Sequence, residues 1–240
     1  LRATYHGMQT EVDAQLGRLL EWLEASGLAG DTLVLVTSDH GELGGDHWCI
    51  GKGGWFDASF WVPLIVRDPR RDADPGRGRV VRAPTEAVDV MPTILEWIGA
   101  EVPLQADGWS LRWALDGREV PEHWRRAAHM EWDFRNPARR LAEQRWGLPS
   151  AHCVLTVLRS GDTKYVQFAA DAAILPPLLF DLGEDPGELH DVARDPRRRD
   201  ACHDAVRELL QWRMREDDRE LANSMLTFDR GLVRSYDPWR

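Results

Sequence analysis

The chain has 240 residues, of which 43% are hydrophobic and 29% are charged, and this composition excludes a largely disordered protein. Its formal net charge of -10 argues against nonspecific binding to nucleic acid, so no nucleic-acid partner is expected. The sequence contains no run approaching the roughly 18 apolar residues that cross a bilayer, so no membrane partner is expected either.

The first third of the chain alternates helix and strand patterns. Apolar residues recur every three or four positions through 2–26 and predict an amphipathic helix. The β-branched run at 32–37 predicts a strand that is buried on both faces of a parallel sheet. Beyond a glycine-rich loop at 41–54, residues 61–66 predict a second strand, whose Pro63 suits a strand start or an edge position.

The middle of the chain carries fewer clear patterns. Residues 68–82 are rich in Asp, Arg, Pro and Gly and predict an exposed loop. A helix is predicted over 89–98, with Pro92 in its first turn, and a short helix is predicted near 110–116. Little else can be assigned between 107 and 150.

The last third predicts a small sheet followed by a helix. Three short apolar runs at 152–158, 164–169 and 178–182 are separated by turn residues and predict an antiparallel meander. A helix is predicted over 200–221. The tail after Asn223 is interpreted as an arm for another subunit, so a homo-oligomer is a candidate assembly.

Asp39 and His40 lie just beyond the first predicted strand, after Ser38, at the end where open α/β sheets bind their ligands. A carboxylate beside an imidazole suits one divalent ion such as Mn, Zn or Fe better than an all-oxygen calcium cage, and Ca remains a candidate. Two protein ligands rarely hold a catalytic metal alone, so the pair predicts half of a metal site. The alternative is an exposed loop Asp beside a His that caps the backbone.

The motif around this pair resembles a known family. The stretches SDHGELGGDH at 38–47, GK at 51–52 and VPLI at 62–65 resemble the sulfatase branch of the alkaline phosphatase superfamily. Within it, the likeness is closest to phosphonate monoester hydrolases and arylsulfatases. The resemblance extends over nearly the whole chain, through EVD at 11–13, VDVMPTIL at 88–95, and LFDL with DPGE at 179–188.

The resemblance implies a role for four residues. Asp39 and His40 match the family's metal ligands. Lys52 matches the lysine that contacts the anionic oxygens of the substrate, where an ammonium neutralises the charge that builds as the ester bond breaks. His47 matches a histidine that would hydrogen-bond the leaving group or orient a ligand. A solvated Lys52 and a structural hydrogen bond from His47 are the alternatives that the residues leave open.

The resemblance also implies a nucleophile, a formylglycine made from Cys or Ser in a Cys/Ser-x-Pro/Ala-x-Arg motif. None of Cys49, Cys153 and Cys202 begins such a motif, and the family's early Asp ligand has no counterpart. Because the chain opens with Leu1 inside a predicted helix, we expect it to be the C-terminal half of a longer enzyme. The spacing of the cysteines indicates no zinc site, so a reducing, cytoplasmic compartment is expected.

The sequence therefore predicts an α/β fold. Residues 1–150 would form the C-terminal part of an alkaline-phosphatase-like sheet flanked by helices, and residues 151–240 a small antiparallel subdomain with a C-terminal helix and tail. The predicted function is metal-dependent hydrolysis of small-molecule sulfate, phosphonate or phosphate esters, and the Asp39-His40 pair favours the phosphonate monoester or phosphodiester group. The alternatives are a catalytically inactive structural or oligomerisation fragment, and a phosphoryl mutase or transferase of the same superfamily with an upstream Ser or Thr nucleophile.

Overall fold

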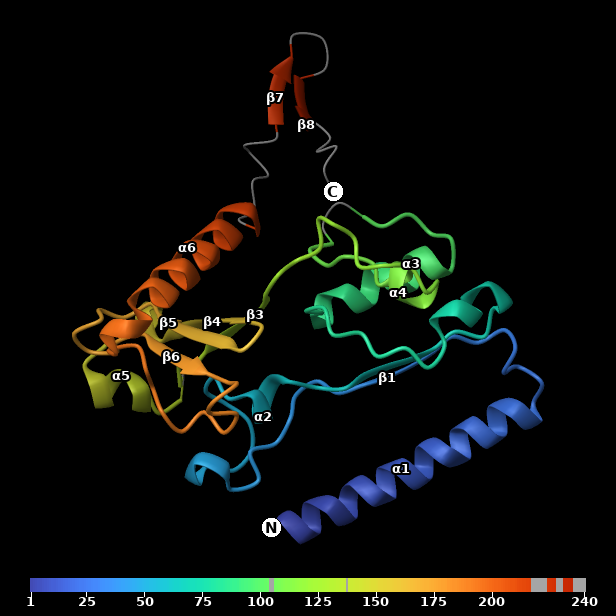
Figure 1. Cartoon of the computed structure of the whole chain (residues 1–240), viewed down its shortest axis with the longest axis horizontal. Coiled ribbons are helices and arrows are strands. Elements are labelled where there is room, and N and C mark those ends of the chain that lie inside the picture. Colours follow the sequence, from blue (N-terminus) through green and yellow to red (C-terminus); the bar gives the residue numbers. More distant parts are fainter. Residues whose placement is uncertain (104–105, 137, 217–223, 228–230, 235–240) are drawn as a thin grey trace. The chain divides into compact units, whose positions relative to one another are not determined.

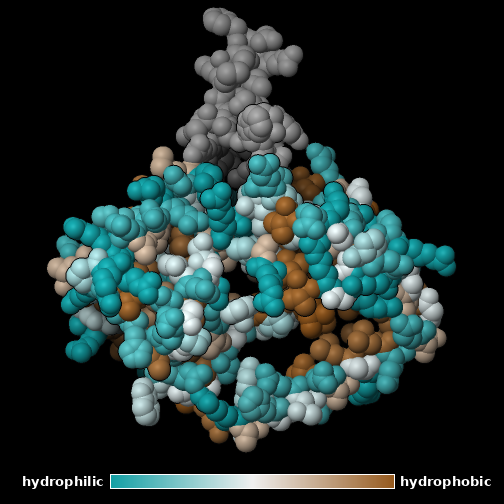
Figure 2. All heavy atoms as spheres, viewed as in Figure 1, coloured by the Kyte–Doolittle hydropathy of each residue, from teal (hydrophilic) through white to brown (hydrophobic). Residues whose placement is uncertain are grey.

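The protein forms two compact units, Leu1–Cys202 and His203–Arg240, with helices and small sheets (Figure 1). This computed structural model describes residues 1–103, 106–136 and 138–216, and the backbone at 224–227 and 231–234. Among these residues, no helix is both long enough and apolar enough to cross a membrane. On the face shown in Figure 2, hydrophilic residues cover most of the surface and hydrophobic residues gather toward its middle.

The predicted N-terminal helix is confirmed as α1, which spans Arg2–Ala25. It ends before Gly27, whose φ of 74° lies in the left-handed region that favours glycine. Of its apolar stripe, Leu23 is buried, whereas the side chains of Met8 and Val12 are exposed. The three-to-four-residue period therefore identifies the helix but does not place its apolar face in a core.

Both predicted strands of the first sheet are confirmed, as β1 (Val34–Thr37) and β2 (Leu64–Arg67). Their pairing is antiparallel, with Thr37 opposite Leu64. The expectation of a parallel strand buried on both faces is thus wrong for β1, because in the described structure it pairs antiparallel with β2 and is half-buried or exposed. An unbroken β-branched run favours a strand without deciding the direction of its neighbour. The motif residues lie on the connection that leaves β1 and returns at β2.

The next segment packs two short helices against tryptophans. The predicted helices are confirmed as α3 (Val90–Trp97) and α4 (Arg112–Leu115). A buried cluster beside them consists of Leu111, Trp113 and Trp124. Short 3-10 helices occur at Asp46–Trp48, Arg71–Gly76, Ala87–Asp89, Ser150–His152 and Pro196–Arg198.

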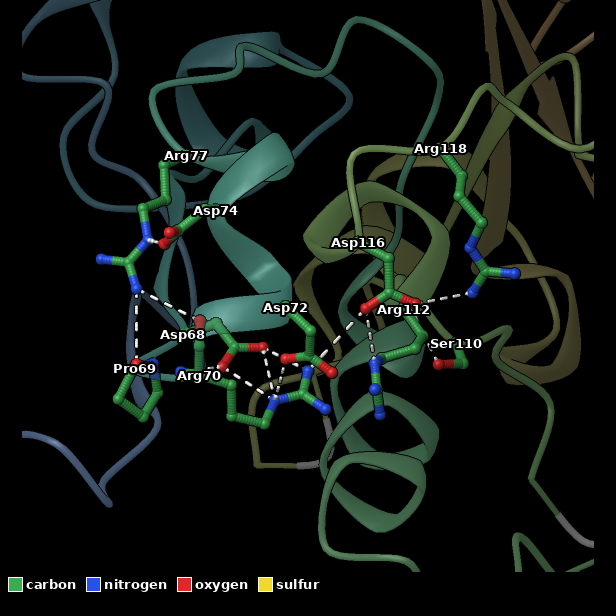
Figure 3. A network of polar contacts seen from close by, with 10 residues as sticks. All are labelled: Asp68, Pro69, Arg70, Asp72, Asp74, Arg77, Ser110, Arg112, Asp116 and Arg118. Atoms are coloured by element: carbon green, nitrogen blue, oxygen red, sulfur yellow. Dashed lines mark hydrogen bonds and ion pairs between the residues drawn. The ribbon is translucent and has the colours of Figure 1, made fainter.

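Ion pairs order the segment that was predicted as an exposed loop. Arg70 pairs with the buried carboxylate of Asp68 and lies 3.8 Å from the carboxylate of Asp116 (Figure 3). Arg112 donates from Nε to Asp116 at 2.9 Å, which joins this segment to α4. Charge pairs therefore help to hold this segment in place, together with the buried side chain of Ala73.

The predicted meander is confirmed, and it belongs to a four-stranded sheet in the order β3-β4-β5-β6. The added strand β3 was not predicted, and it pairs antiparallel with β4. Apolar residues of the sheet form one buried cluster that includes Leu155, Val166 and Phe180. The elements of this region are β3 (Ala128–Asp133), α5 (Leu141–Trp146), β4 (Val154–Ser160), β5 (Thr163–Phe168) and β6 (Leu178–Asp181).

The predicted C-terminal helix is confirmed as α6, which spans Arg199–Glu216, and the rest of its predicted length lies outside the described residues. The backbone further along forms a hairpin of β7 (Ser224–Thr227) and β8 (Gly231–Arg234). Much of the tail interpreted as a subunit arm lies outside the described residues, so that interpretation stays a prediction. The predicted domain division at residue 150 also stays a prediction.

A buried ion network ties the motif connection to the small sheet. It involves α2 (Asp57–Phe60), a single helical turn before β2. Lys164 on β5 is almost fully buried, and its Nζ lies 2.6 Å from Asp57 Oδ1 and also pairs with Glu188. Arg159 donates from Nε to the other Asp57 oxygen at 2.9 Å, and Glu188 accepts from the Asp57 amide at 2.8 Å. Buried charges persist when they are paired and hydrogen-bonded, so this network fixes α2 on β4 and β5.

Replacing Lys164 by Met should lower the free energy of unfolding by about 3–5 kcal/mol, because Asp57 and Glu188 would lose their shared cation. Urea denaturation followed by circular dichroism measures the change. The control is Arg207→Met, which breaks an exposed pair with Asp204 and should cost less than about 1 kcal/mol. Equal losses in the two variants would contradict the role of the network.

A second buried acidic pair anchors the start of α3. Asp89 is fully buried, pairs with Arg125 and accepts from the Trp109 amide at 2.8 Å. Glu86 accepts from the His129 amide at 2.8 Å. Burial acts to raise the pKa of Glu86, but the hydrogen bond to the His129 side chain and the charge of Arg125 outweigh it and hold that pKa below its ordinary value of 4.5.

Stability should therefore fall as the pH drops below 4.5, the ordinary value for Glu86. The lowered pKa means that the Glu86 carboxylate stabilises the fold above the unfolded-state value, and this stabilisation is lost as the pH falls through the folded-state pKa. When the pH is lowered from neutral to about 3, in the acid range where Glu side chains titrate, the melting temperature of Glu86→Gln should fall less than that of the wild-type protein. Glu119→Gln, at an exposed position, should keep the wild-type profile, and an unchanged profile in Glu86→Gln would contradict this assignment.

Candidate functional site

Asp39 and His40 leave the end of β1 with their side chains turned toward each other. Asp39 Oδ2 lies 3.3 Å from His40 Nε2, and Asp39 Oδ1 accepts a hydrogen bond from the His40 amide at 2.9 Å. His40 Nδ1 lies 2.8 Å from the carbonyl oxygen of Gly41. That oxygen can only accept, so Nδ1 carries a proton and Nε2 keeps its lone pair in the neutral ring.

The Asp39 carboxylate is open to solvent and ready to accept a cation. Its side chain is 81% exposed. Desolvation acts to raise the pKa of Asp39, but the hydrogen bond from the His40 amide and the charges of His40 and Lys52 lower it below its ordinary value of 3.8. The carboxylate is therefore ionised at neutral pH.

The donor atoms of the pair fit part of a metal ligand set. Metal-binding histidines usually donate their other ring N–H to a carboxylate or backbone carbonyl, and His40 does so to Gly41. A carboxylate oxygen next to an imidazole nitrogen suits a Mn-, Zn- or Fe-type ion. Across the part of the chain that the structure describes, no group of three or more His, Cys, Asp and Glu residues is placed to hold a metal ion. The pair thus supplies two donors, and other ligands would have to complete the coordination.

Glu42 closes the base of the glycine-rich loop. Its Oε1 accepts hydrogen bonds from the amides of Gly44 at 2.9 Å and Gly51 at 2.7 Å. These two bonds hold the pKa of Glu42 below its ordinary value of 4.5. Lys52 follows Gly51 directly, with an exposed side chain, so the Glu42 clamp fixes the backbone from which the ammonium reaches the charge of Asp39.

His47 lies on a strained part of the same loop. Its φ of 51° and the φ of 60° at Trp48 place two successive non-glycine residues in the left-handed region, which costs of order 1–3 kcal/mol each. The His47 ring stacks on Phe56, with centroids 3.6 Å apart and planes 13° apart. This stacking holds the imidazole against the residue that precedes α2.

The two ends of the loop are packed tightly by α2. The Gly41 amide donates to the carbonyl oxygen of Ser59 at 2.7 Å, and a Cβ on Gly41 would lie only 2.1 Å from the carbonyl oxygen of Ala58. Gly53, with a φ of 147°, lies against Trp132 of β3, where a Cβ would come within 3.1 Å of the indole ring. Glycine is therefore required at position 41 by space and at position 53 by conformation.

The chain that carries this loop is similar to known proteins. Residues 1–100 match the family model "Sulfatase". The chain is 40% identical over 224 residues to the multifunctional alkaline phosphatase superfamily protein PehA of Trinickia caryophylli, which covers 93% of this chain and 42% of PehA. It is 33% identical over 195 residues to arylsulfatase K of Mus musculus, with coverages of 81% and 33%.

A solved structure shows the same similarity. The phosphonate monoester hydrolase of Agrobacterium radiobacter superposes with a TM-score of 0.89 at 44% identity, over 98% of this chain and 45% of that one. These matches confirm the predicted resemblance to the sulfatase branch of the alkaline phosphatase superfamily. The chain spans less than half the length of each of these three relatives. The predicted α/β fold of the alkaline phosphatase type is confirmed by the structural match.

The structure brings some of the predicted site residues together. Asp39 and His40 are in contact, and Lys52 lies within electrostatic reach of Asp39, whereas His47 contacts Phe56. The catalytic, substrate-binding and metal-binding roles of these four residues stay predictions. Sequence reasoning missed Ser59, because a lone serine in a four-residue helix carries no signal of its contacts with Gly41 and Gly53.

Replacing Gly41 by Ala should displace the loop next to His40 and destabilise the protein by about 1–3 kcal/mol or more, because the added methyl would overlap the Ala58 backbone. The matched control is Gly30→Ala, where the space around the added methyl is open, and its effect should stay within about 0.5 kcal/mol. Thermal unfolding of the two variants gives the comparison. Similar melting temperatures would show that the tight contact at Gly41 is wrong.

Proposed function

We propose that the protein carrying this chain is a metal-dependent hydrolase of small sulfate, phosphonate or phosphate esters. The observation that supports this most directly is the geometry of Asp39 and His40, whose donor atoms lie 3.3 Å apart with the His40 tautomer set by Gly41. The identity to PehA and to a phosphonate monoester hydrolase supports ester chemistry at that position. Because this chain spans less than half of those proteins, the activity is proposed for the whole protein.

The residues of the loop would have different roles in the reaction. Asp39 and His40 would hold one divalent ion of the Mn, Zn, Fe or Ca type, which when bound would act as a Lewis acid toward the ester oxygens. Lys52 would contact the non-bridging anionic oxygens and stabilise the charge that develops on them. His47, held by its stacking on Phe56, would hydrogen-bond the leaving-group oxygen.

The nucleophile must be a residue outside this set. The formylglycine implied by the family resemblance has no precursor among the three cysteines, since none begins a Cys-x-Pro/Ala-x-Arg motif. Burial raises the pKa of the Cys153 and Cys202 thiols, which disfavours their thiolates as nucleophiles. We therefore propose that the nucleophile lies in the part of the enzyme that this chain does not span.

The substrate preference is proposed to be phosphonate monoesters or phosphodiesters rather than sulfate esters. An adjacent Asp and His, in place of Asp and Asn, favours that group, and so does the TM-score of 0.89 to a phosphonate monoester hydrolase. Release of p-nitrophenol from its phenylphosphonate, bis-phosphate and sulfate esters in the presence of Mn²⁺ tests the order. Faster turnover of the sulfate ester would reverse this preference without affecting the proposed hydrolase chemistry.

Asp39→Ala should lower ester hydrolysis and retained metal more than about 100-fold, beyond the 10–100-fold typical of residues that only support a ligand. Asp31→Ala, at an exposed position just before β1, is the control and should keep both near the wild-type values. Metal content by plasma mass spectrometry and initial rates give the two readouts. Wild-type metal content and rate in Asp39→Ala would show that the metal assignment is wrong.

The same assays separate the alternatives. Turnover at the metal-only background in the wild-type protein would favour a catalytically inactive structural or oligomerisation fragment. Transfer of the phosphoryl group to an added alcohol in preference to water would favour a mutase or transferase. The expected cytoplasmic location and the homo-oligomer formed through the C-terminal tail stay proposals, and sedimentation velocity tests the second.

A further inference from the structure

One residue of α2 contacts both halves of the proposed site. The carbonyl oxygen of Ser59 accepts a hydrogen bond from the Gly41 amide at 2.7 Å. Its hydroxyl accepts from the Gly53 amide at 3.3 Å and donates to the Gly53 carbonyl oxygen at 3.2 Å. Gly41 directly follows His40, and Gly53 directly follows Lys52. A single serine thus binds the backbone next to the metal pair and the backbone next to the anion-binding lysine.

The two glycines have little freedom to move around this serine. Ser59 is fully buried. Gly41 lies so close to the Ala58 carbonyl that no side chain fits there, and Gly53 lies against the Trp132 indole. Glycine has the greatest backbone freedom of any residue, so the two stretches would separate easily without such contacts. The Ser59 bonds therefore help to set the position of Lys52 relative to that of His40, together with the Glu42 clamp and the bond from the Leu43 amide to the Gly51 carbonyl oxygen.

α2 is itself held against the sheet by ion pairs. Asp57, two residues before Ser59, is paired with Lys164 on β5 and Arg159 on β4. The carboxylate is held from both of its oxygens, which restrains the rotation of the helical turn as well as its position. Ser59 therefore links the loop to a rigid support rather than to another mobile segment.

We propose that Ser59 is a positioning residue that sets the spacing between His40 and Lys52, and thereby the geometry in which an anionic substrate group meets the metal and the ammonium together. The proposal rests on the proposed function for its substrate class. Binding a phosphoryl or sulfuryl group at two points requires both points at the correct separation. A misplacement of about 1 Å can cost on the order of a hundredfold in rate, even when it arises away from the reacting atoms.

The test compares Ser59→Ala with Thr93→Val. Thr93 is a matched control because it is also fully buried and its hydroxyl also bridges two backbone groups, donating to the Asp89 carbonyl at 2.6 Å and accepting from the Leu111 amide at 2.8 Å. Each change deletes a hydroxyl that hydrogen-bonds two backbone groups, so the losses of stability should be similar. Ser59→Ala keeps the bond from the Gly41 amide, because that bond is made to the Ser59 carbonyl oxygen. Only the Ser59 change should affect the site.

The readout is the dissociation constant of inorganic phosphate from the Mn²⁺-loaded protein, measured by calorimetry, which needs no turnover. Ser59→Ala should raise this dissociation constant about tenfold or more, which corresponds to about 1.4 kcal/mol of binding free energy. Thr93→Val should change it by no more than about twofold. In the hydrolysis assay, Ser59→Ala should raise KM and lower kcat together. Ser59→Cys, with a somewhat larger side chain and weaker hydrogen bonds, should lie between Ser59→Ala and the wild type, and it carries the comparison if Ser59→Ala does not fold.

The outcomes separate this inference from the proposed function. Equal phosphate affinity in the Ser59 variants and Thr93→Val would overturn the positioning role. A wild-type protein that binds Mn²⁺ and phosphate but hydrolyses no ester would overturn the proposed function and leave the Ser59 inference standing. A wild-type protein that binds neither would overturn both.

Discussion

The buried pairing of Lys164 with Asp57 and Glu188 is the constraint on which the site depends. The three charges come from α2, from β5 and from the turn after β6, and Lys164 and Asp57 are 107 residues apart. Removing charges from water is unfavourable unless they meet their partners, so α2 has one position on the sheet in which this network closes. The position of α2 in turn sets the positions of its neighbours. His47 is placed through its stacking on Phe56, and the ends of the loop are placed through Ser59.

The loop combines a rigid frame with strained and permissive backbone. Glycines at its two ends allow close approach to α2, and the Glu42 clamp closes its base. His47 and Trp48 hold left-handed conformations that cost free energy and persist because the surrounding bonds determine them. Sites that orient a small anion need side chains held by a second set of contacts, and in this loop those contacts are made by α2 and by the sheet.

Local sequence patterns predicted most of the helices and strands, whereas contacts between residues far apart in the chain could not be predicted from them. The helical period found α1, and the apolar runs found β1, β2 and the meander. Strand β3 was not predicted, although its sequence AHMEWD alternates apolar Ala, Met and Trp with polar His, Glu and Asp, the period of two that is typical of a half-buried strand. The direction of β1 was mispredicted because a strand pattern does not encode its neighbour. The Asp39-His40 motif was found by its residue types, but Ser59 and Lys164 act through partners far along the chain.

The charges at the loop make anion binding depend on the metal. Asp39 contributes one negative charge and Lys52 one positive charge, so these two charges cancel without a cation. An ester anion would then meet an exposed carboxylate that repels it and competes for the ammonium. A divalent ion held by Asp39 and His40 would change the local charge to plus two. The carboxylate would then bind the ion and would no longer compete with the substrate anion for the ammonium. Under the proposed function, metal and anionic substrate should therefore bind with positive coupling, and each should tighten the other by the same factor.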